Sequence, residues 1–480
     1  MAFDIHLFPC RQKPICTMSR FTTFVSAAVA ASTLLSPVVD AACTREQDDT
    51  CPMQLRLAYA GHDGMVVSWN TYSQLSHPSV RYGKDPHHLD KVARTLEPNT
   101  VYHYLPLDSN VTGPYSFKTS RHKGDHTPYS MAVVVDLGLI GADGLSTTVG
   151  NGAANPLKPG DNNTLQSLMS QGADTDFLWH RRKIQGYLPN TTLEEGAQVY
   201  ESLLNQYYDE MTPITAFKPY MVTTVEPRTK SIILLTMSSI CLPGQTNFTG
   251  LINHFRMPSK QSGGLGNFWY SFDYGMVHYV QLDTETDLGH GYIAPDEPNG
   301  TAGEDAGPFS NLKNAQTDWL AKDLASVDRK KTPWVVVAGH RPWYISIGTS
   351  AADICYGCKD VFEPLFLKYG VDLVLAGHVH AYERNAPIAN WTADPRGLEN
   401  PSAPWYIVNG AAGHYDGLDT LVEPRNNYSR FSLDTVYGWS RLTFHNCSHL
   451  THEFVGSANG TVLDTATLFK DRDCGGHKSH

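Results

Sequence analysis

The chain has 480 residues, of which 41% are hydrophobic and 18% charged, as is typical of a soluble globular protein. This length exceeds one simple core, so the sequence predicts two or three domains. The formal net charge of -11 argues against nucleic acid as a partner, because a phosphate backbone favours a basic surface.

Residues 1–42 are predicted to form a secretory signal region. The segment 21–42 is small and apolar, carries no charge before Asp40, and follows the short basic start Met18-Ser19-Arg20. Serine and proline interrupt this segment too often for a good membrane span, so no span is expected after signal removal. Met18 is the expected working start, and the mature chain is expected to be secreted and extracellular.

Nine Asn-X-Ser/Thr sequences agree with secretion, and several of them are expected to carry glycans. The predicted glycosylation sites are Asn110, Asn162, Asn190, Asn247, Asn299, Asn390, Asn427, Asn446 and Asn459.

Seven cysteines remain after residue 42, and an oxidising compartment would pair most of them. Because seven is odd, one cysteine is expected to lack a partner. Cys355 and Cys358 could form a redox or metal-binding pair, but a local structural disulfide is the better interpretation of their spacing.

Residues 43–122 are predicted to form an all-β domain of the fibronectin type III kind. Short alternating segments at 53–60 and 65–69 are joined by the turn 61–64, and similar segments follow up to residue 120. Little strand material lies between Tyr82 and Val101, so this domain is expected to be short.

From residue 126 the pattern changes to continuous apolar runs, at 130–135, 334–338 and 371–376. Such runs predict strands that are buried on both faces of a sheet. Helical patterns at 311–327 and 361–369 lie between them, and Gly370 is expected to end the second helix. Helix followed by strand, twice over, predicts a layered α/β domain.

Polar residues follow each of these three runs: Asp136, His340, His378 and His380. Nearby glycines are expected to let the chain turn sharply, and ligands in such folds bind beyond the carboxyl ends of the strands. Each residue alone has a structural explanation, such as a helix cap or a satisfied core histidine. Together, one carboxylate and three imidazoles predict a metal site, in which His378 and His380 serve two adjacent ions.

These segments together resemble the purple acid phosphatases of the metallophosphoesterase superfamily, nearest to the secreted fungal members. The motifs are VDLG at 135–138, VAGHRPWY at 337–344, AGHVHAYER at 376–384 and NGAAGHYDG at 409–417. The resemblance covers nearly the whole chain after Cys43. It implies an α/β (α+β) fold of two mixed sheets flanked by helices, with a catalytic domain at 126–400 and a completing C-terminal segment at 401–474.

The resemblance also implies an acid phosphatase that hydrolyses small phosphate monoesters with Fe(III) and a divalent Zn, Fe or Mn ion. Asp136 and His380 would belong to the ferric site, and His340 and His378 to the divalent site. Nucleic acid is not implied as a substrate, and no catalytic acid or oligomeric state is assigned.

Two family motifs are absent. GDxxY is expected after the strand at 176–180, where Arg181 to Tyr187 read RRKIQGY instead. GNHE is expected after 218–222, where an unrelated segment begins at Thr223, and its loss would leave Cys241 unpaired. Each ion would keep two protein ligands, although three or four are usual, so weak metal binding and little hydrolysis are expected.

Two explanations of the missing motifs stay open: mis-joined coding segments, or a protein that has lost catalysis. In the second case the chain would be an inactive secreted glycoprotein that acts as a binding module.

Asp283, Glu285 and Asp287 could also bind a cation, although an ordinary loop is the better interpretation.

Overall fold

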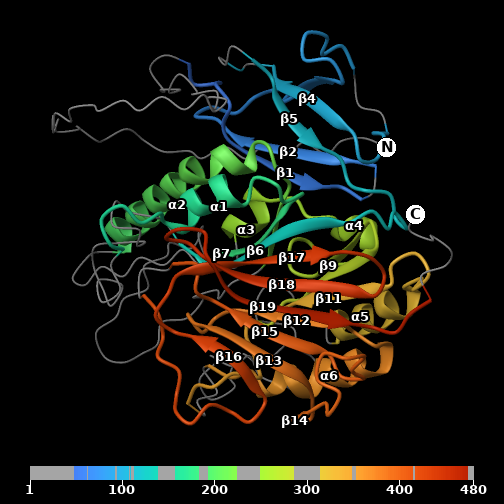
Figure 1. Ribbon diagram of the computed structural model, residues 1–480. Helices are drawn as coiled ribbons and strands as arrows, with labels where there is room; N and C mark the ends of the chain where they lie inside the picture. Colours follow the sequence, from blue (N-terminus) through green and yellow to red (C-terminus); the bar gives the residue numbers. More distant parts are fainter. Residues whose placement is uncertain are drawn as a thin grey trace.

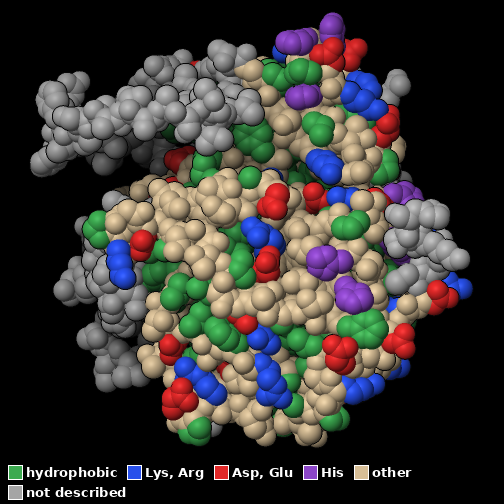
Figure 2. Space-filling view, in the orientation of Figure 1, with side chains coloured by type: hydrophobic (Ala, Val, Ile, Leu, Met, Phe, Trp, Pro, Cys, Tyr) green, Lys and Arg blue, Asp and Glu red, His purple; other side chains and the backbone are tan. Residues whose placement is uncertain are grey.

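The structure is a computed structural model. It describes residues 48–61, 63–91, 95–107, 109, 113–138, 157–182, 193–223, 249–285, 314–348, 353–413 and 417–473. In these ranges no helix is both long and apolar enough to cross a membrane. Figure 2 shows acidic and basic side chains interspersed on the described part of one face, without a continuous basic field.

Two mixed sheets form the body of the protein (Figure 1), which confirms the predicted fold class. The six-stranded sheet has the order β19 (Val462–Phe469), β18 (His449–Gly456), β17 (Gly438–Phe444), β6 (Tyr129–Leu137), β7 (Leu178–Arg182) and β8 (Tyr220–Thr223). In this sheet β6, β7 and β8 are parallel, and the other pairs are antiparallel.

The second sheet has eight strands and a parallel centre. Its order is β14 (Thr392–Ala393), β13 (Tyr382–Ala389), β15 (Trp405–Asn409), β12 (Leu373–Ala376), β11 (Trp334–Ala338), β10 (Val277–Gln281) and β9 (Tyr270–Tyr274), with β16 (Ser429–Leu433) paired to β13. The four strands β10, β11, β12 and β15 run parallel, so their carboxyl ends share one edge.

Helices cover the sheets on both sides. In Figure 1, α1 (Thr164–Gln171), α2 (Leu193–Thr215) and α3 (Thr249–His254) lie toward the N-terminal strands, and α4 (Ser259–Ser262) is a short turn nearby. The helices α5 (Ala315–Ser326) and α6 (Tyr356–Tyr369) contact each other beside the eight-stranded sheet. As predicted, α6 ends at Gly370, which has the left-handed φ of 65°.

Five short strands precede these sheets. The strands β1 (Met53–Tyr59) and β2 (Met65–Asn70) form one pair, and β3 (Val80–Gly83), β4 (Val101–Pro106) and β5 (Tyr115–Lys118) form a three-stranded sheet. The Thr215 hydroxyl at the end of α2 donates to the Leu55 carbonyl, and the Tyr104 hydroxyl donates to the Ala216 carbonyl. These bonds tie the N-terminal strands to the end of α2.

The continuous apolar runs are explained by burial on both faces. Val336 and Leu375 belong to the core between the two sheets, whereas Val335, Val337 and Val374 belong to the core beneath α5 and α6. Each buried side chain of this kind contributes about 1.5–3 kcal/mol relative to its exposed state. Neither face of these strands therefore tolerates the polar residue that an alternating pattern would supply.

The predicted local disulfide joins Cys355 to Cys358 at the start of α6. Cys51 takes part in a disulfide, and so does Cys447. Cys241, predicted to be unpaired, lies outside the described residues.

A buried charge network anchors α5 to the hairpin of β9 and β10. His278 contacts Asp273 Oδ1 through Nδ1 at 2.8 Å and Asp323 Oδ2 through Nε2 at 2.9 Å. Burial alone would lower the pKa of His278, but the hydrogen bonds to both carboxylates outweigh burial and raise it to about 9. His278 is therefore charged at neutral and acidic pH.

We expect His278→Gln to destabilise the protein most at acidic pH. A folded-state pKa of about 9 exceeds the unfolded value near 6.5, so the stabilisation is complete below about pH 6.5 and is lost as pH rises through 9. Removing the cation leaves the buried Asp323 carboxylate without its charged partner, at a cost of up to about 3–5 kcal/mol, whereas the half-buried Asp273 keeps its ion pair with Lys123. Unfolding measured from pH 5 to 10 checks this, with the exposed His77→Gln as control. A mutant–wild-type difference that does not change with pH would contradict it.

Candidate metal centre

Asp136 lies at the carboxyl end of β6, where the strand is irregular. The pairing with β7 shifts register between Val135 and Leu137, so Asp136 sits in a bulge with a left-handed φ of 57°. A bulge re-aims the side chain it carries, and aspartate is among the residues that tolerate this backbone conformation. The Asp136 side chain is fully buried.

Two glycines leave room for this carboxylate. A Cβ at Gly377 would lie 2.0 Å from Val135 Cγ1 and 2.7 Å from Asp136 Oδ2, and one at Gly410 would lie 2.9 Å from the same oxygen. Asp136 and His378 themselves take the left-handed conformation, with φ of 57° and 69°. Gly377 and Gly410 are needed for close approach instead.

Three of the four predicted ligands form one cluster. The backbone N–H of His378 donates to Asp136 Oδ2 at 2.6 Å, and His378 Nδ1 lies 3.2 Å from His340 Nε2. His340 Nδ1 lies 3.7 Å from Asp136 Oδ1. Two nitrogens bound tetrahedrally to one ion at about 2.0–2.1 Å would lie about 3.3 Å apart. The spacing of the two imidazole nitrogens therefore fits shared coordination of one ion.

His380 is buried and is held through its backbone. Its N–H donates to Asp419 Oδ2 at 2.7 Å, and the Asp419 N–H donates back to the His380 carbonyl at 3.0 Å. Within the described ranges, no three His, Cys, Asp or Glu side chains are arranged as a complete metal site. The cluster as folded is thus a partial donor set.

Arg341 is a buried neighbour of the cluster that the sequence analysis missed. Its Nε donates to Glu285 Oε2 at 3.0 Å, and its Nη1 lies 3.0 Å from His378 Nε2. Because a guanidinium can only donate, His378 Nε2 accepts this bond and a neutral His378 carries its proton on Nδ1. That proton then points to His340 Nε2, so the hydrogen bonds run in one direction from Arg341 to His340.

The loop that follows β10 supports these residues. The backbone N–H groups of His340 and Arg341 both donate to Thr284 Oγ1, at 3.1 and 3.0 Å. Asp283 Oδ1 accepts the N–H of Glu285 at 2.9 Å, which is a bond within the loop. Asp287 lies outside the described residues. Two features of the sequence were available to predict the ion pair of Arg341 with Glu285. Arg341 directly follows His340, and Glu285 lies in the acidic segment that follows β10.

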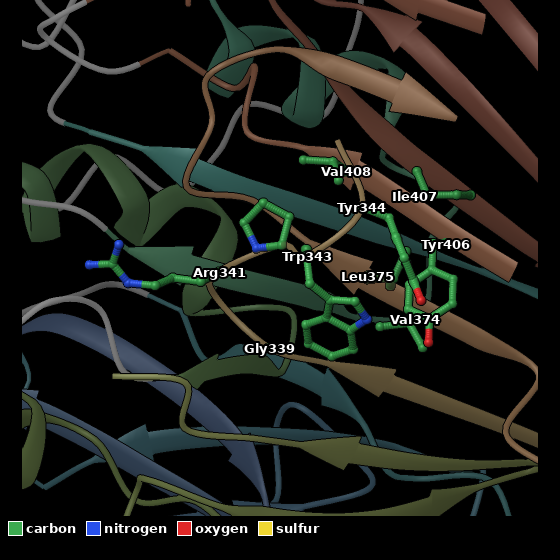
Figure 3. Close-up of a pocket in the computed structure, with 11 residues that line it drawn as sticks. Gly339, Arg341, Trp343, Tyr344, Val374, Leu375, Tyr406, Ile407 and Val408 are labelled. Atoms are coloured by element: carbon green, nitrogen blue, oxygen red, sulfur yellow. The ribbon is translucent and has the colours of Figure 1, made fainter. Parts of the chain in front are cut away.

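A neighbouring cavity is apolar in character. Its lining includes Pro342, Trp343, Val374 and Tyr406, and Figure 3 shows the Arg341 side chain pointing away from these rings. The polar chemistry therefore lies on the other side of the backbone at Arg341.

The strands that precede the two missing motifs are present. In the parallel sheet Arg181 pairs with Val135 and Thr223 pairs with Arg181, so the ends of β7 and β8 lie beside the end of β6. Residues 183–192 and 224–248, which stand where both motifs are expected, are outside the described residues.

The fold is that of the calcineurin-like phosphoesterases. The family model "Calcineurin-like phosphoesterase" matches residues 244–382, and "Iron/zinc purple acid phosphatase-like protein C" matches residues 403–465. The chain is 37% identical to acid phosphatase A of Cryphonectria parasitica, over 89% of this chain and 93% of that protein. It therefore belongs to the purple acid phosphatase family.

Other relatives agree. An acid phosphatase of Aspergillus ficuum is 31% identical, over 87% of this chain and 86% of that protein. The structure of the purple acid phosphatase PPD1 from yellow lupin (Lupinus luteus) seeds has a TM-score of 0.64 at 21% identity, covering 88% of this chain and 75% of that one. At that identity the likeness shows the shared fold.

We expect Arg341→Met to destabilise the protein strongly. The substitution removes the guanidinium from the buried Glu285 carboxylate, and breaking such a pair costs about 3–5 kcal/mol. The double variant Glu285→Gln, Arg341→Met should recover part of this loss, which a double-mutant cycle by denaturant unfolding measures. Arg430→Met, at an exposed arginine, is the control. Additive effects of the two single substitutions would contradict direct coupling.

Proposed function

We propose that this chain is a secreted phosphatase that hydrolyses small phosphate monoesters at a metal centre, with reduced activity. The observation that carries the proposal is the 3.2 Å spacing of His340 Nε2 and His378 Nδ1 next to the buried Asp136 carboxylate. Membership of the purple acid phosphatase family supports phosphoester hydrolysis.

The donor set suits the metals that the family resemblance implies. Imidazole nitrogens of His340 and His378 suit a divalent zinc, iron or manganese ion, and the Asp136 carboxylate, with His380, suits hard Fe(III). When bound, such ions neutralise the phosphate charge and acidify a water molecule. The residues themselves contribute fixed donors, of which Asp136, His340 and His380 are buried and His378 is half-buried, because Gly377 and Gly410 allow the carboxylate to approach the His378 backbone.

Three features support weak metal binding. The sequence lacks the bridging aspartate and the tyrosine of GDxxY, and it lacks the asparagine and histidine of GNHE. The four remaining ligands would be divided between two ions, below the usual three or four for each. In addition, Arg341 places the proton of neutral His378 on Nδ1, so this nitrogen must lose the proton to bind an ion.

The rival function is an inactive secreted glycoprotein that binds a partner. The replacement of both catalytic motifs favours this rival function, because a protein that does not catalyse a reaction does not need to keep its catalytic residues. Metal analysis with a phosphate-release assay at acidic pH separates the two: turnover supports the enzyme, and absence of both metal and turnover supports the binding module. Sequencing the transcript across residues 181–187 and 225–231 tests whether coding segments were mis-joined.

The predicted glycosylation sites differ in their exposure to solvent. Asn390, Asn427, Asn446 and Asn459 are exposed. Asn162 is half-buried, and the Thr164 of its sequence is buried and hydrogen-bonded to Ser457 at 2.7 Å. The other predicted sites, Asn110, Asn190, Asn247 and Asn299, lie outside the described residues.

We expect His378→Ala to remove what metal the protein binds. After equilibration with Zn²⁺ or Mn²⁺ and gel filtration, wild type should retain at most one ion per chain, and the variant close to none. Phosphate release from a synthetic monoester should fall about 100-fold or more, because a metal ligand is lost. The exposed His445→Ala is the matched control. Equal metal content in His378→Ala and wild type would refute the assignment.

Glycopeptide mass spectrometry of the protein expressed in a fungal host tests the secretion proposal. We expect glycans on Asn390, Asn427, Asn446 and Asn459, because these side chains are exposed, and little or none on Asn162. Thr392→Ala should abolish modification at Asn390 alone. A secreted protein without any of the four glycans, or full occupancy of Asn162, would contradict the accessibility argument.

A further inference from the structure

A cavity of about 230 Å³ lies at the amino-terminal ends of β11 and β12. It is lined by His126, Arg329, Lys330, Pro333, Cys447, Arg472 and Asp473. Pro333 directly precedes β11 and Asp372 directly precedes β12, whereas His340 and His378 follow the same two strands. Asp372 and His378 are six positions apart at the two ends of β12, which corresponds to roughly 20 Å along an extended chain. The cavity is thus at the opposite edge of the sheet from the candidate metal centre.

One buried carboxylate beside this cavity faces three cations. Asp372 is fully buried, and its Oδ2 accepts from Arg329 Nη1 at 2.9 Å. Its Oδ1 accepts from Arg472 Nη2 and lies 3.6 Å from Lys470 Nζ. Burial would raise the pKa of Asp372, but Arg472, Arg329 and Lys470 outweigh burial and hold it below its usual value. Asp372 is therefore ionised and can balance only one of these cations.

The positive charge is in excess around the cavity. Among the described residues that line it or contact Asp372, four are strongly basic (Arg329, Lys330, Lys470, Arg472) and two are acidic (Asp372, Asp473). Burial lowers the pKa values of Lys470 and Arg472, and the neighbouring guanidinium groups lower them further. Partly buried cations that outnumber their counter-charges repel one another, and an anion in the cavity would relieve this repulsion.

The two arginines are held in place before any ligand arrives. Arg329 donates to the carbonyls of Pro333 at 2.8 Å and Tyr369 at 2.9 Å. The Arg472 guanidinium lies over the Trp334 ring, 4.5 Å from its centre. Fixed cations lose little conformational entropy on binding, which favours a specific site over a diffuse basic surface.

We propose that this cavity is a second site, separate from the metal centre, that binds a tetrahedral oxyanion such as a phosphate or sulfate group. Arg329, Lys330 and Arg472 supply the positive charge. The Nη N–H groups of Arg329 already donate to Asp372 and to the carbonyls of Pro333, Tyr369 and Gly370, so Arg329 acts on an anion through its charge. The cavity volume is about 230 Å³. It exceeds a lone oxyanion, so part of an attached organic group also fits.

The test is binding of inorganic phosphate and sulfate to the full-length, metal-free protein. Thermal unfolding is followed against anion concentration at constant ionic strength set with chloride. Lys330→Glu reverses the charge of an exposed lining residue, and Lys322→Glu makes the same change at an exposed lysine on α5 that does not line the cavity. His378→Ala separates this site from the metal centre.

We expect saturable stabilisation by both anions in wild type, Lys322→Glu and His378→Ala. Lys330→Glu should weaken the apparent affinity about tenfold or more, as expected for a lost charge-assisted contact. Three results would each overturn the proposal: no effect beyond chloride in wild type, equal weakening in both lysine variants, or loss of binding in His378→Ala.

Discussion

A hydrogen bond to a buried carboxylate joins the two sheets at the candidate metal centre. The His378 N–H, beyond the end of β12 in the eight-stranded sheet, donates to the Asp136 carboxylate at the end of β6 in the six-stranded sheet. The bond requires left-handed backbone at both residues and the absence of side chains at Gly377 and Gly410. The 3.2 Å spacing of His340 and His378 follows from the neighbouring strands β11 and β12, whereas the addition of a carboxylate to this pair depends on the approach of one sheet to the other.

Much of the fold was predictable because a strand that is buried on both faces has a continuous apolar run in its sequence. The run at 334–338 coincides with β11, and Gly370 ends α6 as expected. The start of α6 was placed too late, since the Cys355 side chain caps the helix at Tyr356, and apolar periodicity does not report a cap. The site was predictable only in part: residue types at strand ends indicated Asp136, His340 and His378, but the direction of the hydrogen bonds from Arg341 depends on tertiary contacts.

The same strands separate two kinds of chemistry. The carboxyl ends of β11 and β12 lead to imidazoles and a carboxylate, whereas their amino ends lead to an excess of arginine and lysine around Asp372. Parallel strands align the ends of one polarity, so each edge of the sheet can collect residues from distant parts of the chain. The charged His278 network adds stability at acidic pH on the neighbouring strand β10, which suits a family of acid phosphatases.

Anomalous X-ray diffraction from crystals equilibrated with Co²⁺ or Zn²⁺ tests the central claim most directly. The account predicts one partly occupied metal peak within about 2.1 Å of both His340 Nε2 and His378 Nδ1. A well-diffracting crystal with no metal peak between these two nitrogens at millimolar metal, or with the two rings turned apart, would contradict it.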